Sequence, residues 1–323
     1  MDQSILFAYD FNGKGSGHKI NSDQVSTKIK EKKLAWVHLD LNHPETENWL
    51  IKELNYLDPF VVKALLAEET RPRITQINEG LLITLRGVNL NDNADAKDMV
   101  SIRLWIDKYR IISLQRRQLK AVQDIQNRLL AHQGPKEAGE FLGFLLEHLF
   151  ERMEPILSDL ETRTDNIEEK IIETPDTRLR KDIINIHRQS IIFHRYIVPQ
   201  RDAIRQILFS TLTWINTSHK NHLQEIDNHA TRYSENLVAL RERAQVIKDE
   251  LANVMNQKVT RNTYILSIVS AIFLPLGFLT GLFGINVGGI PGSNNADAFW
   301  IFCSLLGLII GFQIFIFRRL KWL

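Results

Sequence analysis

The chain has 323 residues, a formal net charge of +2 and 24% charged residues. This length allows about two domains, and the nearly balanced charge argues against a nucleic-acid-binding protein. We interpret the basic residues Arg116, Arg117 and Lys120 as an ordinary solvated helix face. The single cysteine, Cys303, excludes a disulfide framework or a thiolate zinc cluster within one chain. The first eleven residues include Asp2 and no basic leader, so we expect no signal peptide.

Residues 1–120 alternate between short β-rich runs and helical patterns, which predicts an α/β domain that stays in the cytoplasm. Strands are expected at Ile5–Tyr9, Ala35–Leu41, Leu81–Val88, Met99–Ile106 and Arg110–Leu114. Helices are expected at Pro44–Leu54 and Pro59–Ala67. Turn residues at 12–17 end the first strand, and the polar residues 89–98 form a loop between two strands.

Helical periodicity dominates after Ala121, with breaks at Gly134-Pro135, at 173–176 and over the polar stretch 216–228. We therefore expect long antiparallel helices over residues 121–222, and Pro199 is expected to kink one of them. A stalk helix follows over residues 223–263. Because no proline occurs between Leu223 and Pro275, this helix can continue into the apolar segment that follows. The continuous helix would be about 90 Å long at 1.5 Å per residue.

Two uncharged apolar runs near the end of the chain predict a transmembrane hairpin. The first spans residues 264–283 and the second residues 299–317, each about 20 residues and long enough to cross roughly 30 Å of hydrocarbon. Lys258 and Arg261 precede the first run, and Arg318 and Arg319 lie in the basic tail, residues 318–323, whereas the linker, residues 284–298, has no Lys or Arg. The positive-inside rule then places both termini in the cytoplasm. The predicted fold is α+β.

One face of the first apolar helix is polar or small instead of hydrophobic. Steps of three and four residues give Asn256, Thr260, Thr263, Ser267, Ser270, Leu274, Gly277 and Gly281. One explanation is close helix packing, because Gly277 and Gly281 form a GxxxG motif. The other is that several copies surround an axis and line a water-filled conduit, with Leu274 as a constriction. Extension of this stripe into the stalk favours the conduit.

Two groups of charged or titratable residues in the stalk region have competing interpretations. Glu235, Glu242 and Asp249 continue the stripe and would form acidic rings that concentrate cations in a symmetric bundle, or they are simply exposed positions of a charged helix. His219 and His222 have an i, i+3 spacing compatible with zinc, or they are surface histidines. Catalytic motifs such as a phosphate loop or His-Glu-x-x-His are absent from the sequence, so we do not expect an enzyme.

The linker after the first apolar run carries the most specific motif. Gly284-Ile285-Asn286, preceded by the run 271–283, resembles the Gly-x-Asn signature of the CorA superfamily of divalent-cation transporters. The resemblance covers the whole chain, since that superfamily also has an N-terminal α/β domain, long helices, a stalk and a C-terminal hairpin. It implies a funnel-shaped homopentamer in a bacterial inner membrane, with five first spans lining the pore and five signature loops forming an outer selectivity ring.

The residues around the signature indicate a branch of the superfamily. Magnesium-type members usually have Met at the position of Ile285 and Met-Pro-Glu-Leu after the signature, where this chain has Gly-Gly-Ile-Pro at 288–291. The string 284–292, together with Arg71-Pro72-Arg73 and the segment 85–89, is similar to the zinc-transporting ZntB branch. The resemblance implies Zn²⁺ as the transported ion and no prosthetic group.

Alternatives to zinc transport stay open at this point. Cd²⁺, Ni²⁺ and Co²⁺ are further candidate ions, because hydrated divalent ions differ little at a neutral ring of Asn286 amides. Five such amides at a wide mouth could hold a cation through its first-shell water, which predicts passage as a largely hydrated ion. The other readings are a CorA-type transporter of Mg²⁺, Co²⁺ or Ni²⁺, and a membrane-anchored sensor or scaffold that conducts nothing.

Overall fold

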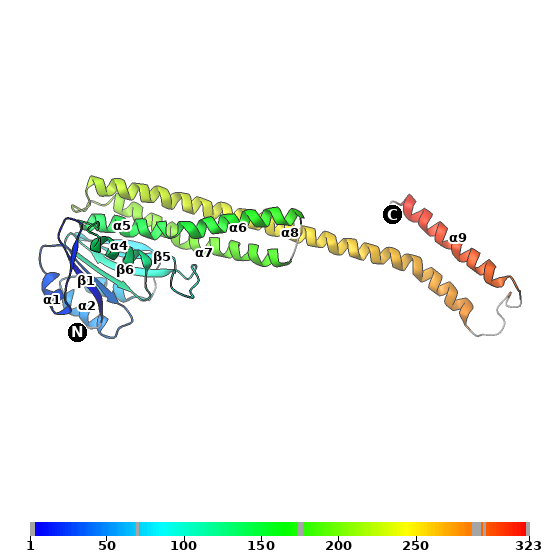
Figure 1. The fold of residues 1–323 in the computed structure, drawn as a ribbon, viewed down its shortest axis with the longest axis horizontal. Helices are drawn as coiled ribbons and strands as arrows, with labels where there is room; N and C mark the ends of the chain where they lie inside the picture. The colour runs from blue at the N-terminus through cyan, green and yellow to red at the C-terminus, as the bar shows by residue number, and fades with distance from the viewer. Residues whose placement is uncertain (1–3, 69–70, 174–176, 286–291, 293–294, 321–323) are drawn as a thin grey trace. The chain divides into compact units, whose positions relative to one another are not determined.

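The computed structural model describes residues 4–68, 71–173, 177–285, 292 and 295–320, which form two compact units, residues 1–249 and 250–323 (Figure 1). In its described part, the first unit is built on a seven-stranded sheet with the order β2-β1-β3-β7-β6-β5-β4. The strands are β1 (Ile5–Phe11), β2 (Gly17–Lys19), β3 (Ala35–Asp40), β4 (Arg73–Ile77), β5 (Gly80–Gly87), β6 (Val100–Ile106) and β7 (Arg110–Gln115). The β3 and β7 strands are parallel and the other neighbours antiparallel.

Helices cover both faces of this sheet. On one face, α1 (Ser22–Lys28), α2 (Glu45–Glu53) and α3 (Pro59–Leu66) contribute to a buried apolar cluster with Val37 and Leu114. On the other face, Phe141 of α5 (Ala138–Glu151) meets Trp36 edge-on, with ring centroids 4.9 Å apart. Alternation along each strand sends successive side chains to opposite faces, so both layers are packed from the same short strands.

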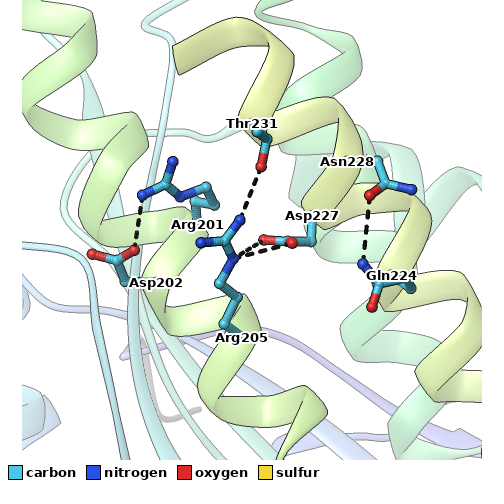
Figure 2. Close-up of polar contacts among 7 residues, drawn as sticks. All are labelled: Arg201, Asp202, Arg205, Gln224, Asp227, Asn228 and Thr231. Atoms are coloured by element: carbon cyan, nitrogen blue, oxygen red, sulfur yellow. Dashed lines mark hydrogen bonds and ion pairs between the residues drawn. The ribbon is translucent and has the colours of Figure 1, made fainter. Parts of the chain in front are cut away.

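The second half of the first unit consists of long helices lying side by side. They are α4 (Lys120–Leu130), α5, α6 (Glu154–Glu173), α7 (Thr177–Leu208) and the first part of α8 (Thr217–Gly284). Figure 2 shows how α7 is joined to α8: the Arg205 guanidinium donates through Nε to both Asp227 carboxylate oxygens, at 3.0 and 3.1 Å, and through Nη2 to Thr231. The carboxylate of Asp227 is almost fully buried, so this contact supplies the charge that burial would otherwise leave uncompensated.

The second unit contains the rest of α8 and α9 (Ala298–Arg319), which are both long and apolar enough to cross a membrane. Helix α8 is continuous over 68 residues with Pro275 inside it. A proline removes one backbone hydrogen bond, and the apolar stretch around Pro275 retains the helix nevertheless. The expected spans 264–283 and 299–317 therefore fall inside α8 and α9.

Three expectations need correction. The polar stretch 216–228 was expected to interrupt the helices, but α8 begins at Thr217. Its positions Leu223 and Ile226 are buried, and so is Asp227, which pairs with Arg205. The stalk therefore begins before residue 223. Arg116 and Arg117 lie in the bend between β7 and α4 and only Lys120 is helical, so these three residues do not form one helix face.

Candidate functional site

The polar stripe lies along one continuous helix and is exposed in the single chain. Its eight residues, Asn256 to Gly281 in steps of three and four, all belong to α8 and are all solvent-exposed. A Cβ added to Gly277 or Gly281 would meet no other atom within 4 Å. The stripe is therefore an open surface within one chain.

Helix α9 contacts a different face of α8. The Gln313 side chain donates to the Ala271 carbonyl at 3.2 Å, and the rings of Phe283 and Phe302 are 5.3 Å apart. Phe283 and the half-buried Ile272 lie roughly opposite Leu274 when about 100° is turned per residue. The GxxxG motif is thus not used against α9 in this chain, and whatever covers the stripe must be another molecule or water.

The hydroxyl groups of this helix are arranged as oxygen acceptors. On the stripe, the Ser267 hydroxyl donates a hydrogen bond to the Thr263 carbonyl at 2.9 Å. A hydroxyl bonded in this way keeps its lone pairs available on the outer side of the helix. Beside the upstream end of the stripe, a hollow of about 660 Å³ is lined by Asn256, Thr260 and further polar side chains. This face can hydrogen-bond the water shell of a cation.

Two further residues line that hollow and were not predicted from the sequence. Gln257 and Arg261 line it, four residues apart and one position beyond Asn256 and Thr260. Their signal was the i, i+4 repeat that starts at Asn253. They add a basic and an amide group next to the stripe.

The signature motif lies at the end of α8 and is only partly described. Gly284 is the last residue of α8, and Ile285 follows it as an exposed residue. Asn286 and residues 287–291 lie outside the described residues. The selectivity ring therefore stays a prediction.

The three acidic residues predicted to form rings are exposed. Glu235, Glu242 and Asp249 are exposed, whereas Leu240 and Ala244 on the opposite side are buried. Both Asp249 carboxylate oxygens accept from Gln245, at 3.0 and 2.8 Å. Exposure is required both by a charged solvated face and by acidic rings, and the ring interpretation stays a prediction.

The two stalk histidines are used in helix packing. His219 and His222 lie against glycines of α5, since a Cβ on Gly139 would be 2.2 Å from Nδ1 of His219 and one on Gly143 would be 2.7 Å from Nδ1 of His222. Their Nε2 atoms approach different carboxylates, 3.7 Å from Glu137 and 3.5 Å from Glu147. Within the described residues, no group of three or more His, Cys, Asp or Glu could hold a metal ion. The proposed pair thus lacks a third ligand there.

The sequence matches a known protein family and has named relatives. Residues 31–319 match the family described as CorA-like Mg²⁺ transporter protein. The chain is 37% identical to the divalent cation transporter CmaX of Pseudomonas aeruginosa, over 100% of this chain and 98% of CmaX. It is 36% identical to the zinc transport protein ZntB of Pectobacterium atrosepticum, over 98% and 96% of the two chains. These relatives are named as transporters and not as enzymes.

Solved structures agree with the sequence relatives. The structure of full-length CmaX covers 100% of this chain and is itself covered to 99%, with a TM-score of 0.86 and 36% identity. The CorA magnesium transporter from Methanocaldococcus jannaschii covers the whole chain with a TM-score of 0.80 at 19% identity, which is a likeness of fold alone. By sequence over most of its length and by fold, the chain belongs to the family of CorA-like Mg²⁺ transporter proteins.

Proposed function

We propose that this chain forms a homopentameric pore in a bacterial inner membrane that carries divalent cations, with Zn²⁺ as its principal ion. The observation that carries the proposal is the polar and small stripe on α8, which is exposed along its length and leaves Gly277 and Gly281 free of contact with α9. Family membership and the similarity to CmaX and ZntB support transport as the activity. In one chain the stripe is uncovered. In a ring of five chains it would face the other four copies across the central axis.

The preference for zinc over magnesium is supported by two kinds of evidence. ZntB proteins from several bacteria are 30–36% identical to this chain over 98% of its length. The signature also has Ile285 and Gly-Gly-Ile-Pro where magnesium-type members usually have Met and Met-Pro-Glu-Leu. Cd²⁺, Ni²⁺ and Co²⁺ share the charge of zinc and are expected as weaker substrates.

The ion is proposed to pass largely hydrated. The hydroxyls of Thr260, Thr263 and Ser267 are neutral oxygen groups that can contact a water shell without displacing it. A ring of Asn286 amides at the outer mouth would act in the same way, with Gly284 allowing the turn that aims it. Exposed Glu242 and Asp249 would raise the local concentration of cations before they reach the stripe.

Orientation follows from the basic residues that flank the two spans. Lys258 and Arg261 precede the first span and Arg318 and Arg319 follow the second. The positive-inside rule then places both termini in the cytoplasm and the signature loop on the outer side.

Blocking the stripe tests the pore directly. Gly281→Leu places a large side chain on the stripe, where the structure leaves open space. Gly307→Leu is the matched control, because Gly307 is on α9 and is equally open. Zinc flux into liposomes containing each purified variant should be lost in Gly281→Leu and kept in Gly307→Leu. Equal flux from both assembled variants would refute the pore-lining role, and no flux from the unsubstituted protein would favour a sensor or scaffold.

A further inference from the structure

A basic cavity lies in the α/β domain, apart from the proposed pore. Its volume is about 560 Å³, and four arginines, one lysine and one aspartate line it together with Tyr196. The charged lining residues are Arg86, Lys97, Asp98, Arg116, Arg117 and Arg195. A cavity of this size is large enough for a small molecule.

Residues far apart in sequence reach this cavity through the strand register. Arg86 on β5 is opposite Ser101 on β6, and Ile102 is opposite Gln115 on β7, so Arg116 emerges beside the same strand end. Strand β5 extends beyond its pairing with β4 here, and the backbone N–H of Arg86 donates to the Gln200 side chain of α7 at 2.8 Å. This contact fixes α7 against the sheet and places its residues on the cavity.

Two of the guanidinium groups are held in place before any ligand arrives. The Tyr196 ring has the Arg86 guanidinium carbon 4.6 Å and the Arg195 guanidinium carbon 4.9 Å from its centroid. Arg195 also donates to the Tyr196 hydroxyl at 3.0 Å, and Arg86 donates to the Met99 carbonyl at 2.7 Å. Because these side chains are already ordered, less conformational entropy is lost when they bind a ligand.

Positive charge exceeds negative charge in the lining. Lys97 pairs with Asp95 at 2.6 Å, which leaves four arginines and Asp98 to face the cavity. Burial lowers the pKa of Arg86; Tyr196 opposes this shift, and the nearby charge of Arg195 adds to it. Burial also lowers the pKa of Arg103 to about 10, with added repulsion from Arg116 and Arg86. An anion in the cavity would relieve this repulsion, whereas a metal cation would increase it.

We propose that this cavity binds a small anion that carries two or more phosphate groups. Guanidinium groups bind phosphate oxygens through paired N–H donors, which suits the forks of Arg116, Arg117 and Arg195. The site is independent of the transported cation, because it lies in the first unit and prefers the opposite charge. Binding would tie α7 to the ends of β5, β6 and β7, so the ligand should also stabilise the domain against heat.

Calorimetric titration of the purified full-length protein in detergent with inorganic pyrophosphate, in metal-free buffer, tests the proposal. Arg116→Gln/Arg117→Gln should weaken binding at least about tenfold, since charge-assisted hydrogen bonds to phosphate are lost. Both arginines are exposed, and Lys32→Gln/Lys33→Gln removes the same charge from other exposed positions as the matched control. The control should bind like the unsubstituted protein.

Two further measurements, on Arg195→Gln and on a lipid, complete the test. Arg195→Gln removes the phosphate-binding guanidinium that α7 contributes. It should weaken pyrophosphate binding even if the double variant were to misfold. No binding of pyrophosphate, or equal binding by all variants, would overturn the proposal. Tighter binding of short-chain phosphatidylglycerol than of pyrophosphate, lost in the same variants, would also overturn the proposal, because this lipid headgroup carries a single phosphate. Tighter binding of pyrophosphate would support it.

Discussion

A buried histidine should make the α/β domain sensitive to acid. His38 on β3 is fully buried, its Nδ1 lies 2.7 Å from the Ser113 hydroxyl, and its ring stacks on Phe7 with centroids 4.8 Å apart. The same Ser113 hydroxyl accepts a hydrogen bond from the Trp36 indole at 2.7 Å. Burial lowers the pKa of His38 from 6.5 to about 4, because the charged imidazolium would lose its water.

The size and direction of the effect follow from this pKa. The unfolded chain takes up a proton at His38 near pH 6.5 and the folded chain does so only near pH 4, so acid favours the unfolded state. The contribution of neutral, buried His38 to the free energy of unfolding is complete above pH 6.5 and is lost as the pH drops toward 4. At about 1.4 kcal/mol per pKa unit, the loss is about 2 kcal/mol at pH 5 and about 3 kcal/mol at pH 4.

The assay compares the pH dependence of unfolding between variants. His38→Gln replaces the imidazole by an amide that stays neutral, and His18→Gln removes an exposed histidine as the matched control. Thermal unfolding of the full-length protein, followed by tryptophan fluorescence between pH 8 and 5, should show a smaller loss of stability for His38→Gln than for the control. Equal pH slopes in the two variants would show that His38 does not cause the acid sensitivity, whatever their stability at pH 8.

Two further predictions concern how α8 is held. Arg205→Ala should cost about 1–2 kcal/mol, because the nearly buried Asp227 loses its partner while Arg205 itself is partly exposed. In thermal melts, adding Asp227→Asn should recover part of that loss, and strictly additive effects would contradict the coupling. Gly139→Ala should cost about 1–3 kcal/mol from overpacking against the His219 ring. The additional change His219→Ala should relieve the clash, and an unchanged melting temperature in Gly139→Ala would show that the helices can separate without cost.

The strands of the sheet were predictable where burial produced a strong pattern. All five expected strands are present within about two residues of their expected ends, because each is a run of apolar or β-branched residues. The short β2 and the strand β4, with sequence RITQI, were missed because neither has a continuous apolar run. The same holds for α1, in which only Val25 is buried.

Helix α8 shows a limit of composition as a guide. Its first residues are polar and were expected to interrupt the helices, yet one narrow buried face is sufficient once α5 and α7 are beside it. His219 and His222 illustrate the same point, since their spacing suggested a metal pair and the structure uses them to pack against Gly139 and Gly143.

The two candidate sites differ in how far the sequence could foretell them. The α8 stripe follows from a helical repeat within one segment, so it was readable from spacing alone. The basic cavity joins Arg86, Arg116 and Arg195, which are distant in sequence and meet only through strand register and α7. Sequence separation hides such a site, because periodicity reports neighbours along one element and not across several.

The most direct test of the central claim is metal flux into liposomes that contain the purified protein and a metal-sensitive dye. Zn²⁺ or Mg²⁺ is added outside, and Asn286→Ala is measured beside the unsubstituted protein. Zinc entry should exceed magnesium entry and should be strongly reduced by Asn286→Ala. Magnesium entry without zinc would contradict the choice of ion, and entry of neither ion would contradict the pore.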